Sequence, residues 1–141
     1  MRYLLDTNIF LLIANDPDKI NPDIQEIIYN YENELCMSSE SLRELIIGYN
    51  NRKYETNKWK TCEEVVLSVS KEYGIQVLPL DKKVMQTYSN LKVNVKQDHH
   101  DPSDHIIISH ALTLKIPLIS TDTKFPFYRQ QGLELLFNKK N

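Results

Sequence analysis

Glycine, cysteine and tryptophan are scarce in this chain of 141 residues, which contains 3 Gly, 2 Cys and 1 Trp. So little glycine, together with only 6 Pro, excludes collagen-like and low-complexity chains. The two cysteines, Cys36 and Cys62, are too few for a disulfide framework and too far apart for a metal knuckle. We expect both to be reduced, packed thiols of a cytosolic protein.

Long apolar runs are also absent. The first apolar stretch, Ile9 to Ala14, is shorter than the apolar part of a signal peptide. No run approaches the roughly 20 residues that a membrane span needs. We therefore expect a cytoplasmic protein with no leader and no membrane contact.

Positive charge is not in excess. The chain has 17 Lys and Arg against 19 Asp and Glu, for a net charge of −2. Domains that hold nucleic acid by bulk charge are strongly basic. Any polyanionic substrate must therefore be held by a local basic patch, by metal ions or by a partner.

The remaining composition is globular, with 41% hydrophobic and 26% charged residues. Short apolar segments alternate with longer segments of helical periodicity, a pattern that favours βαβ units and a parallel sheet. Strands are expected at residues 2–6, 34–37, 75–78, 117–120 and 133–137. The sequence predicts one domain over residues 1–141, a three-layer α/β/α sandwich around a central, mainly parallel sheet.

Local signals predict where the helices begin and end. A helix that begins at Thr7 is broken at 15–17, and Ser41-Leu42-Arg43-Glu44 fits a capping box for a helix that ends near residue 49. Gly74 follows a predicted helix over 57–73, where glycine commonly ends a helix. Further helices are expected over 22–33, after Asp81 and over 103–114.

Four acidic residues fall at the predicted connections between strands and helices. Asp6 and Asp122 follow strands, whereas Glu44 and Asp104 lie in the first turns of helices. Each one alone is explained as a helix cap or a turn residue. Because the carboxyl ends of parallel strands share one edge of the sheet, we expect the four to converge there. Gathered carboxylates repel one another unless cations hold them.

Carboxylates without a matching set of His and Cys are typical of hard divalent ions, Mg²⁺ or Mn²⁺. Two such ions about 3.5–4 Å apart can activate a water and stabilise the leaving oxygen when a phosphodiester bond is cleaved. The sequence therefore points to metal-dependent phosphodiester chemistry.

These motifs resemble those of the PIN-domain family, and the whole chain resembles its VapC-type toxins. The segments that carry the resemblance are Leu4-Leu5-Asp6-Thr7-Asn8-Ile9, Ser39 to Gly48, Asp101-Pro102-Ser103-Asp104-His105-Ile106-Ile107-Ile108, and Ile119-Ser120-Thr121-Asp122. The resemblance implies a Mg²⁺- or Mn²⁺-dependent endoribonuclease whose acidic site comprises Asp6, Glu44, Asp104 and Asp122. It further implies Asn8 and Ser120 as hydrogen-bonding neighbours of that site, a homodimer, and a cognate protein antitoxin.

Two positions depart from the family's pattern or complicate it. His105 stands where many relatives have Arg, and Asp101 offers a second carboxylate beside Asp104. We expect Asp101 to cap the helix and Asp104 to face the site. The other histidines, His99, His100 and His110, lie close to His105 in sequence but lack a second His or Cys pair. We expect this His-rich loop to be solvated.

Two short basic and aromatic segments, Arg52-Lys53-Tyr54 and Lys58-Trp59-Lys60, leave two interpretations open. Cations interleaved with aromatics suit single-stranded RNA, and Arg52, Lys53 and Lys58 are then the candidate RNA contacts. Alternatively, the segments form a solvated hairpin in which Trp59 packs inward or against a partner.

Two other functions compete with the nuclease. A non-catalytic PIN-like module that binds RNA or protein does not need all four acids, which are present here. A phosphotransferase with Asp6 as its nucleophile needs a second Asp two residues later, but position 8 is Asn8. We therefore favour the nuclease.

Overall fold

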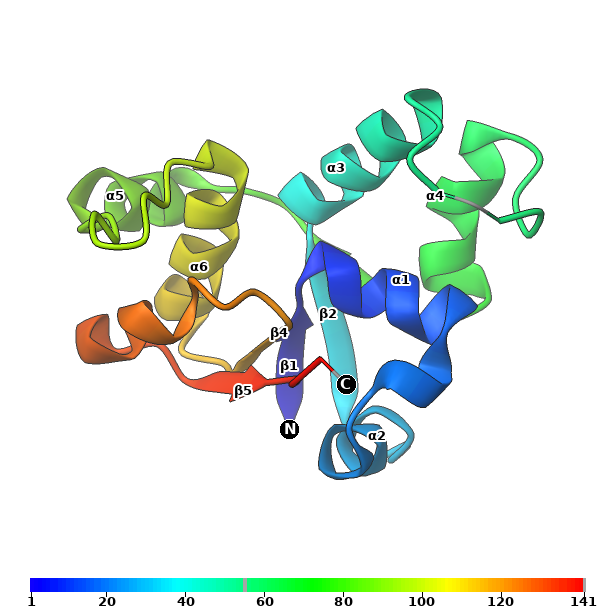
Figure 1. Ribbon diagram of the computed structural model, residues 1–141, viewed down its shortest axis with the longest axis horizontal. Coiled ribbons are helices and arrows are strands. Elements are labelled where there is room, and N and C mark those ends of the chain that lie inside the picture. The colour runs from blue at the N-terminus through cyan, green and yellow to red at the C-terminus, as the bar shows by residue number, and fades with distance from the viewer. Residues whose placement is uncertain (55, 141) are drawn as a thin grey trace.

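The computed structural model describes residues 1–54 and 56–140, and its centre is a sheet of five parallel strands (Figure 1). Their spatial order is β3-β2-β1-β4-β5. The strands are β1 (Arg2–Leu5), β2 (Glu34–Ser38), β3 (Gln76–Leu78), β4 (Leu118–Ser120) and β5 (Leu135–Phe137). The predicted α/β sandwich is thus confirmed, while Glu55 and Asn141 of the predicted domain lie outside the described residues.

Helices cover both faces of the sheet, with α1 to α4 on one face and α5 and α6 on the other (Figure 1). They are α1 (Thr7–Asn15), α2 (Pro22–Ile28), α3 (Ser39–Asn50), α4 (Cys62–Lys71), α5 (Lys82–Asn90) and α6 (Pro102–Leu114), with short 3₁₀ helices η1 (Pro17–Lys19) and η2 (Pro126–Gln131). Among the described residues, none of these helices has the length and apolar character that crossing a membrane demands.

Side chains along each strand alternate between the two faces of the sheet, and each face has its own hydrophobic core. Tyr3 and Leu5 of β1 face the core beneath α1 to α4, whereas Leu4 between them faces the core beneath α6 and η2. Successive side chains of a strand point to opposite faces, so a strand buried on both faces is apolar throughout. That is the reason for the uniform apolar character of Tyr3, Leu4 and Leu5.

The strand order determines where a ligand site can form. The chain builds β2 and β3 on one side of β1, and then returns to build β4 and β5 on its other side. Ligands of such sheets bind at the carboxyl ends of the strands, at the point where the order reverses. In this protein that point lies between β1 and β4, which Asp6 and Thr121 directly follow.

The expected capping box at Ser41–Glu44 is wrong. Helix α3 begins at Ser39, and the side chain of Ser38 caps it by accepting a hydrogen bond from the Glu40 N–H. Strand β2 therefore leads into α3 without a loop, because its last residue is also the cap. The hydroxyl of Ser41 is buried without a hydrogen-bond partner in the described part of the chain.

Two other predicted helix boundaries also differ. The helix expected over 22–33 ends at Ile28, and the one expected from residue 57 begins at Cys62. At this second start Thr61 is the N-cap and accepts from the Glu64 N–H, while the Glu64 carboxylate accepts from the N–H of Lys60, the residue before the cap. The same helix ends at Lys71 rather than at residue 73, and Gly74, three residues later, has the left-handed backbone (φ +64°).

Gly48 in α3 is explained by close packing. A side chain at this position would overlap the ring of Tyr54, which lies over Gly48 and whose hydroxyl donates to the backbone carbonyl of Glu44 (3.5 Å). The missing side chain lets the segment after α3 fold back along the helix.

Candidate functional site

The four predicted acids converge at the carboxyl edge of the sheet. One carboxylate oxygen each from Asp6, Glu44 and Asp104 lies within 4.8 Å of the other two. Asp122 belongs to an overlapping group, in which one of its oxygens lies within 4.8 Å of atoms of Asp104 and His99. All four carboxylates line a cavity of about 170 Å³, which we call the acidic cavity.

Asp6 is the most buried of the four, with 4% of its surface exposed. It is the N-cap of α1: Oδ1 accepts from the Thr7 N–H (2.8 Å), and Oδ2 accepts from the Ser120 hydroxyl (2.7 Å). Burial raises the pKa of Asp6 to about 7, and the Ser120 hydrogen bond counteracts part of that increase. The expected role of Ser120 as a hydrogen-bonding neighbour of the acids agrees with this contact.

Glu44 is linked to the start of α1. Its Oε1 accepts a hydrogen bond from the Thr7 hydroxyl (2.7 Å), so Thr7 connects the Asp6 cap to the Glu44 carboxylate. Burial raises the pKa of Glu44, and the hydrogen bond from Thr7 opposes that increase.

Asp104 stands in the first turn of α6, and its pKa is raised to about 8. Burial is the largest cause, followed by repulsion from Asp101 and Asp122. Asp101 is the N-cap of α6, since its Oδ1 accepts from the Ser103 N–H (3.0 Å). The two carboxylates therefore have the separate places that the sequence predicted, with Asp101 at the cap and Asp104 in the site.

His99 is the principal residue of the site that sequence reasoning missed. It is 1% exposed, and its Nε2 lies 2.9 Å from Oδ2 of Asp104. Its Nδ1 lies 2.9 Å from the hydroxyl oxygen of Tyr128, and that oxygen accepts from the Asn94 N–H. The imidazole is thus held through both ring nitrogens, between the Tyr128 hydroxyl and the Asp104 carboxyl.

The expectation of a solvated His-rich loop is wrong for three of the four histidines. Only His100 is exposed, whereas His99, His105 and His110 are 1–6% exposed. His105 donates through Nε2 to the backbone carbonyl of His99 (3.0 Å), and His110 contacts the Ser38 hydroxyl (2.9 Å). Their burial lowers the pKa of all three, so they are neutral side chains of the interior. A sequence signal for this was available, because His105 and His110 lie among apolar residues of an amphipathic helix.

Asp122 and Asn8 are held less firmly. The Asp122 backbone N–H donates to Ser120 Oγ (3.1 Å), and its Oδ1 accepts from the Lys124 N–H (2.8 Å). Asn8 is exposed and lines the acidic cavity from the first turn of α1. Of the two expected hydrogen-bonding neighbours, Ser120 contacts the acids and Asn8 borders them.

The two basic and aromatic segments, residues 52–54 and 58–60, differ in whether they border the acidic cavity. Trp59 is 5% exposed and stacks on Phe10 (6.1 Å between ring centres), so it packs inward. Lys58 pairs with Glu72 (3.1 Å) on the outside of that packing. Lys53 lines the acidic cavity, and its neighbour Arg52 is exposed. Of the three candidate RNA contacts, only Lys53 borders the site.

The donor chemistry of the acidic cavity fits a hard divalent ion. Asp6, Glu44 and Asp104 offer carboxylate oxygens alone, which match Mg²⁺ or Mn²⁺. His99 Nε2 contacts the same Asp104 carboxylate and orients it from the interior.

Comparisons with known proteins agree with this geometry. A family model described as PIN domain matches residues 3–131. Among solved structures, VapBC2 from Rickettsia felis bound to a promoter DNA fragment has a TM-score of 0.68 at 24% identity, with 97% of this chain and 98% of that chain covered. VapBC-1 from nontypeable Haemophilus influenzae has a TM-score of 0.68 at 25% identity, with the same coverage. DNA-bound VapBC from Salmonella typhimurium has a TM-score of 0.65 at 23% identity, again with 97% and 98% covered. No curated protein is similar enough in sequence to count as a match.

The family match extends over β1, β4 and all four carboxylates of the acidic cavity. The fold of the solved VapBC structures is likewise shared over nearly the whole chain. This chain belongs to the PIN domain family.

Proposed function

We propose that the protein is a metal-dependent endoribonuclease and the toxin of a type II toxin–antitoxin pair. The observation that carries this proposal is the convergence of Asp6, Glu44 and Asp104 within 4.8 Å, in a chain of a family for which nuclease activity is typical. Asp6 and Asp104 are the principal metal ligands, and Glu44 and Asp122 complete the acidic cluster.

The electrostatics of the acidic cavity support a divalent ion. Burial and mutual repulsion raise the pKa of Asp6 to about 7 and that of Asp104 to about 8, so without a cation the cluster retains protons near neutrality. When bound, Mg²⁺ or Mn²⁺ supplies Lewis-acid stabilisation of the phosphate and activates the attacking water.

The side chains around the cluster orient the ligands. Ser120 and the Thr7 N–H each hold one oxygen of Asp6, and the Thr7 hydroxyl holds Glu44. His99 holds Asp104 from the opposite side. Glu44 and Asp122 border the same cavity, and we assign them to position the attacking water at the phosphodiester bond.

The proposed partners follow from the resemblance. Several solved structures of this fold are described as VapBC or toxin–antitoxin complexes, which supports a cognate protein antitoxin for this chain. We also propose a homodimer in the cytoplasm, where RNA substrates are found.

The test is cleavage of total RNA by the purified protein in Mg²⁺ or Mn²⁺, with EDTA and Asp104→Asn as the comparisons. Asp101→Asn is the matched control, because asparagine is as good an N-cap as aspartate. We expect discrete fragments from the wild type and from Asp101→Asn. We expect Asp104→Asn to lose at least about 100-fold in rate, since residues behind metal ligands already cost 10–100-fold.

The fragment ends would identify the RNA and the bond that is cut. A folded wild-type protein that neither cleaves RNA nor binds Mn²⁺ would overturn the nuclease. The non-catalytic module would then be the better description of this chain.

A further inference from the structure

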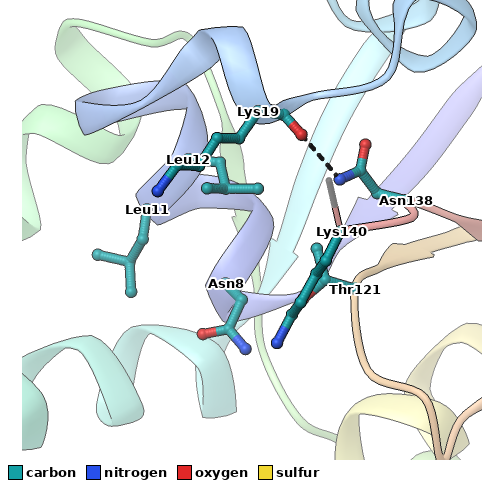
Figure 2. Close-up of a pocket in the computed structure, with 7 residues that line it drawn as sticks. All are labelled: Asn8, Leu11, Leu12, Lys19, Thr121, Asn138 and Lys140. Carbon is teal, nitrogen blue, oxygen red and sulfur yellow. Dashed lines mark hydrogen bonds between the residues drawn. The ribbon is translucent and has the colours of Figure 1, made fainter.

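A second cavity adjoins the acidic cavity and differs from it in charge. It has a volume of about 430 Å³, within the usual range of small-molecule sites. We call it the lysine pocket (Figure 2), and its lining residues are Asn8, Leu11, Leu12, Lys19, Thr121, Asn138 and Lys140. Every charged side chain of this lining is a lysine.

The lysine pocket is assembled from parts of the chain that are far apart in sequence. Lys19 comes from η1, and Lys140 comes from the segment after β5. Figure 2 shows their side chains entering the pocket from different sides, with the Lys140 side chain running toward Asn8. Leu11 and Leu12 of α1 add apolar surface to the lining.

A reciprocal pair of asparagines holds the segment after β5 against η1. Asn138 Oδ1 accepts from the Asn21 N–H (2.7 Å), and Asn138 Nδ2 donates to the Lys19 carbonyl (3.1 Å). Asn21 Oδ1 accepts from the Lys139 N–H (2.8 Å), and Asn21 Nδ2 donates to the Lys139 carbonyl (3.1 Å). Asn138 is 1% exposed. The backbones that carry Lys19 and Lys140 are therefore fixed relative to each other.

The two cavities are neighbours, since Asn8 and Leu11 line both. A polyanionic strand that passed through both cavities would contact Lys53 in the acidic cavity, and Lys19 and Lys140 in the lysine pocket. The net charge of −2 offers a polyanion no general attraction, so such local cations have to hold it.

We propose that the lysine pocket binds the nucleotide of single-stranded RNA that adjoins the cleaved bond. This inference rests on the proposed nuclease function and extends it to a substrate-binding site. Lys19 and Lys140 contact backbone phosphates, while Asn8 and Thr121 offer hydrogen bonds to the sugar or base. Leu11 and Leu12 contact the face of the base.

The composition of the pocket favours RNA over a peptide. A single strand presents regularly spaced phosphates beside apolar base faces, and this lining pairs two cations with a leucine surface. Two of the three residues that the sequence suggested as RNA contacts do not border either cavity. Lys58 pairs with Glu72, and Arg52 lies outside both linings. The lysine pocket supplies the cations that these two residues do not.

The test measures binding of a short fluorescein-labelled single-stranded RNA by anisotropy across a series of KCl concentrations. Ca²⁺ replaces Mg²⁺ because it also takes oxygen ligands, and recovery of intact RNA confirms that no cleavage has occurred. The pocket variant is Lys19→Gln/Lys140→Gln. The matched control is Lys82→Gln/Lys83→Gln, which removes the same charge from two exposed lysines of α5 outside both linings.

We expect the pocket variant to bind RNA about tenfold more weakly than the control, as for two exposed phosphate contacts. The slope of log K against log salt should fall by about 0.7 for each lysine. In Mg²⁺, KM should rise while kcat stays close to that of the control, because the lost contacts are present in both ground and transition states.

Equal RNA binding by pocket variant and control would overturn the inference. If the wild type still cleaved RNA in a manner that needs Asp104, the nuclease would stand without this subsite. A wild type that neither bound nor cleaved RNA would overturn the nuclease and the inference together. A pocket variant that kept RNA affinity but lost binding of the antitoxin would show a protein contact instead, which also overturns the inference.

Discussion

His99 Nε2 lies 2.9 Å from Oδ2 of Asp104, and this contact joins the interior of the protein to its acidic cavity. Behind His99, the Tyr128 hydroxyl and the Asn94 N–H continue the hydrogen-bonded chain. One carboxylate oxygen of Asp104 is thereby oriented from the core, and the carboxylate reaches toward Asp6 and Glu44.

Replacing His99 should weaken metal binding through the loss of its hydrogen bond with Asp104. We expect His99→Leu to bind Mn²⁺ at least about tenfold more weakly, measured by electron paramagnetic resonance titration of free Mn²⁺. His99→Gln retains an amide donor and should lose less affinity. His100→Leu is the matched control, because His100 is exposed and contacts Asp98 rather than the site. Unchanged Mn²⁺ affinity in His99→Leu would contradict the role of His99 in orienting Asp104. Equal losses of Mn²⁺ affinity in His99→Leu and His99→Gln would show that His99 acts through packing alone.

Replacing Ser120 should destabilise Asp6 and its surroundings. The Ser120 hydroxyl donates to Asp6 Oδ2 and accepts from the Asp122 N–H, so Ser120→Ala removes the partner of a buried carboxylate oxygen and of a half-buried N–H. We expect a loss of about 1–3 kcal/mol in the free energy of unfolding, measured with urea near neutral pH. The pKa of Asp6 should rise above about 7, so the acid limb of the pH–rate profile should move to higher pH.

Ser41→Ala is the control for this prediction. Ser41 is also fully buried, but its hydroxyl has no hydrogen-bond partner in the described part of the chain. Its removal should change the free energy of unfolding by less than about 0.5 kcal/mol. Similar losses in the two variants would show that the effect of Ser120→Ala comes from lost packing.

Without metal, the protein should lose stability as the pH rises from about 6.5 to about 8.5. The pKa values of Asp6 and Asp104 rise from 3.8 in the unfolded chain to about 7 and about 8 in the folded protein. In this pH range the folded state therefore binds more protons than the unfolded state, so the free energy of unfolding falls as the pH rises. Below pH 6.5 the buried histidines have the opposite effect. Their pKa values are lowered by folding, so the unfolded state binds more protons there and the free energy of unfolding rises with pH.

Thermal unfolding in EDTA is the measurement for the pH prediction, and we expect Tm to fall by about 5 °C across the range. Asp104→Asn should reduce the decrease, because it removes one of the two titrating carboxyls. Saturating Mn²⁺ should also reduce it, because the ion replaces the protons of the cluster. A Tm in EDTA that stays constant or rises would contradict the raised pKa values.

The sequence by itself determined the elements and the residues that stand at their ends. Hydrophobic periodicity and turn residues are local, so they located all five strands to within two residues and predicted the parallel sheet. The four acids could be named because each lies close after a strand or near the start of a helix: Asp6 directly follows β1, Asp122 lies two residues after β4, Asp104 is in the first turn of α6, and Glu44 is in the second turn of α3. Helix starts were less certain, because Ser38 and Ser41 are both good caps, and only the end of β2 decides between them.

Tertiary structure alone decided which atoms meet. The order β3-β2-β1-β4-β5 brings Ser120 to Asp6, and the turn before α6 buries His99 against Asp104. The lysine pocket joins Lys19 to Lys140 from nearly opposite ends of the chain. Such contacts depend on the order of the strands and on how their connections pack, and no local pattern encodes either. The physical reason is that periodicity reports which face of an element is buried, whereas a site depends on which elements share an edge of the sheet.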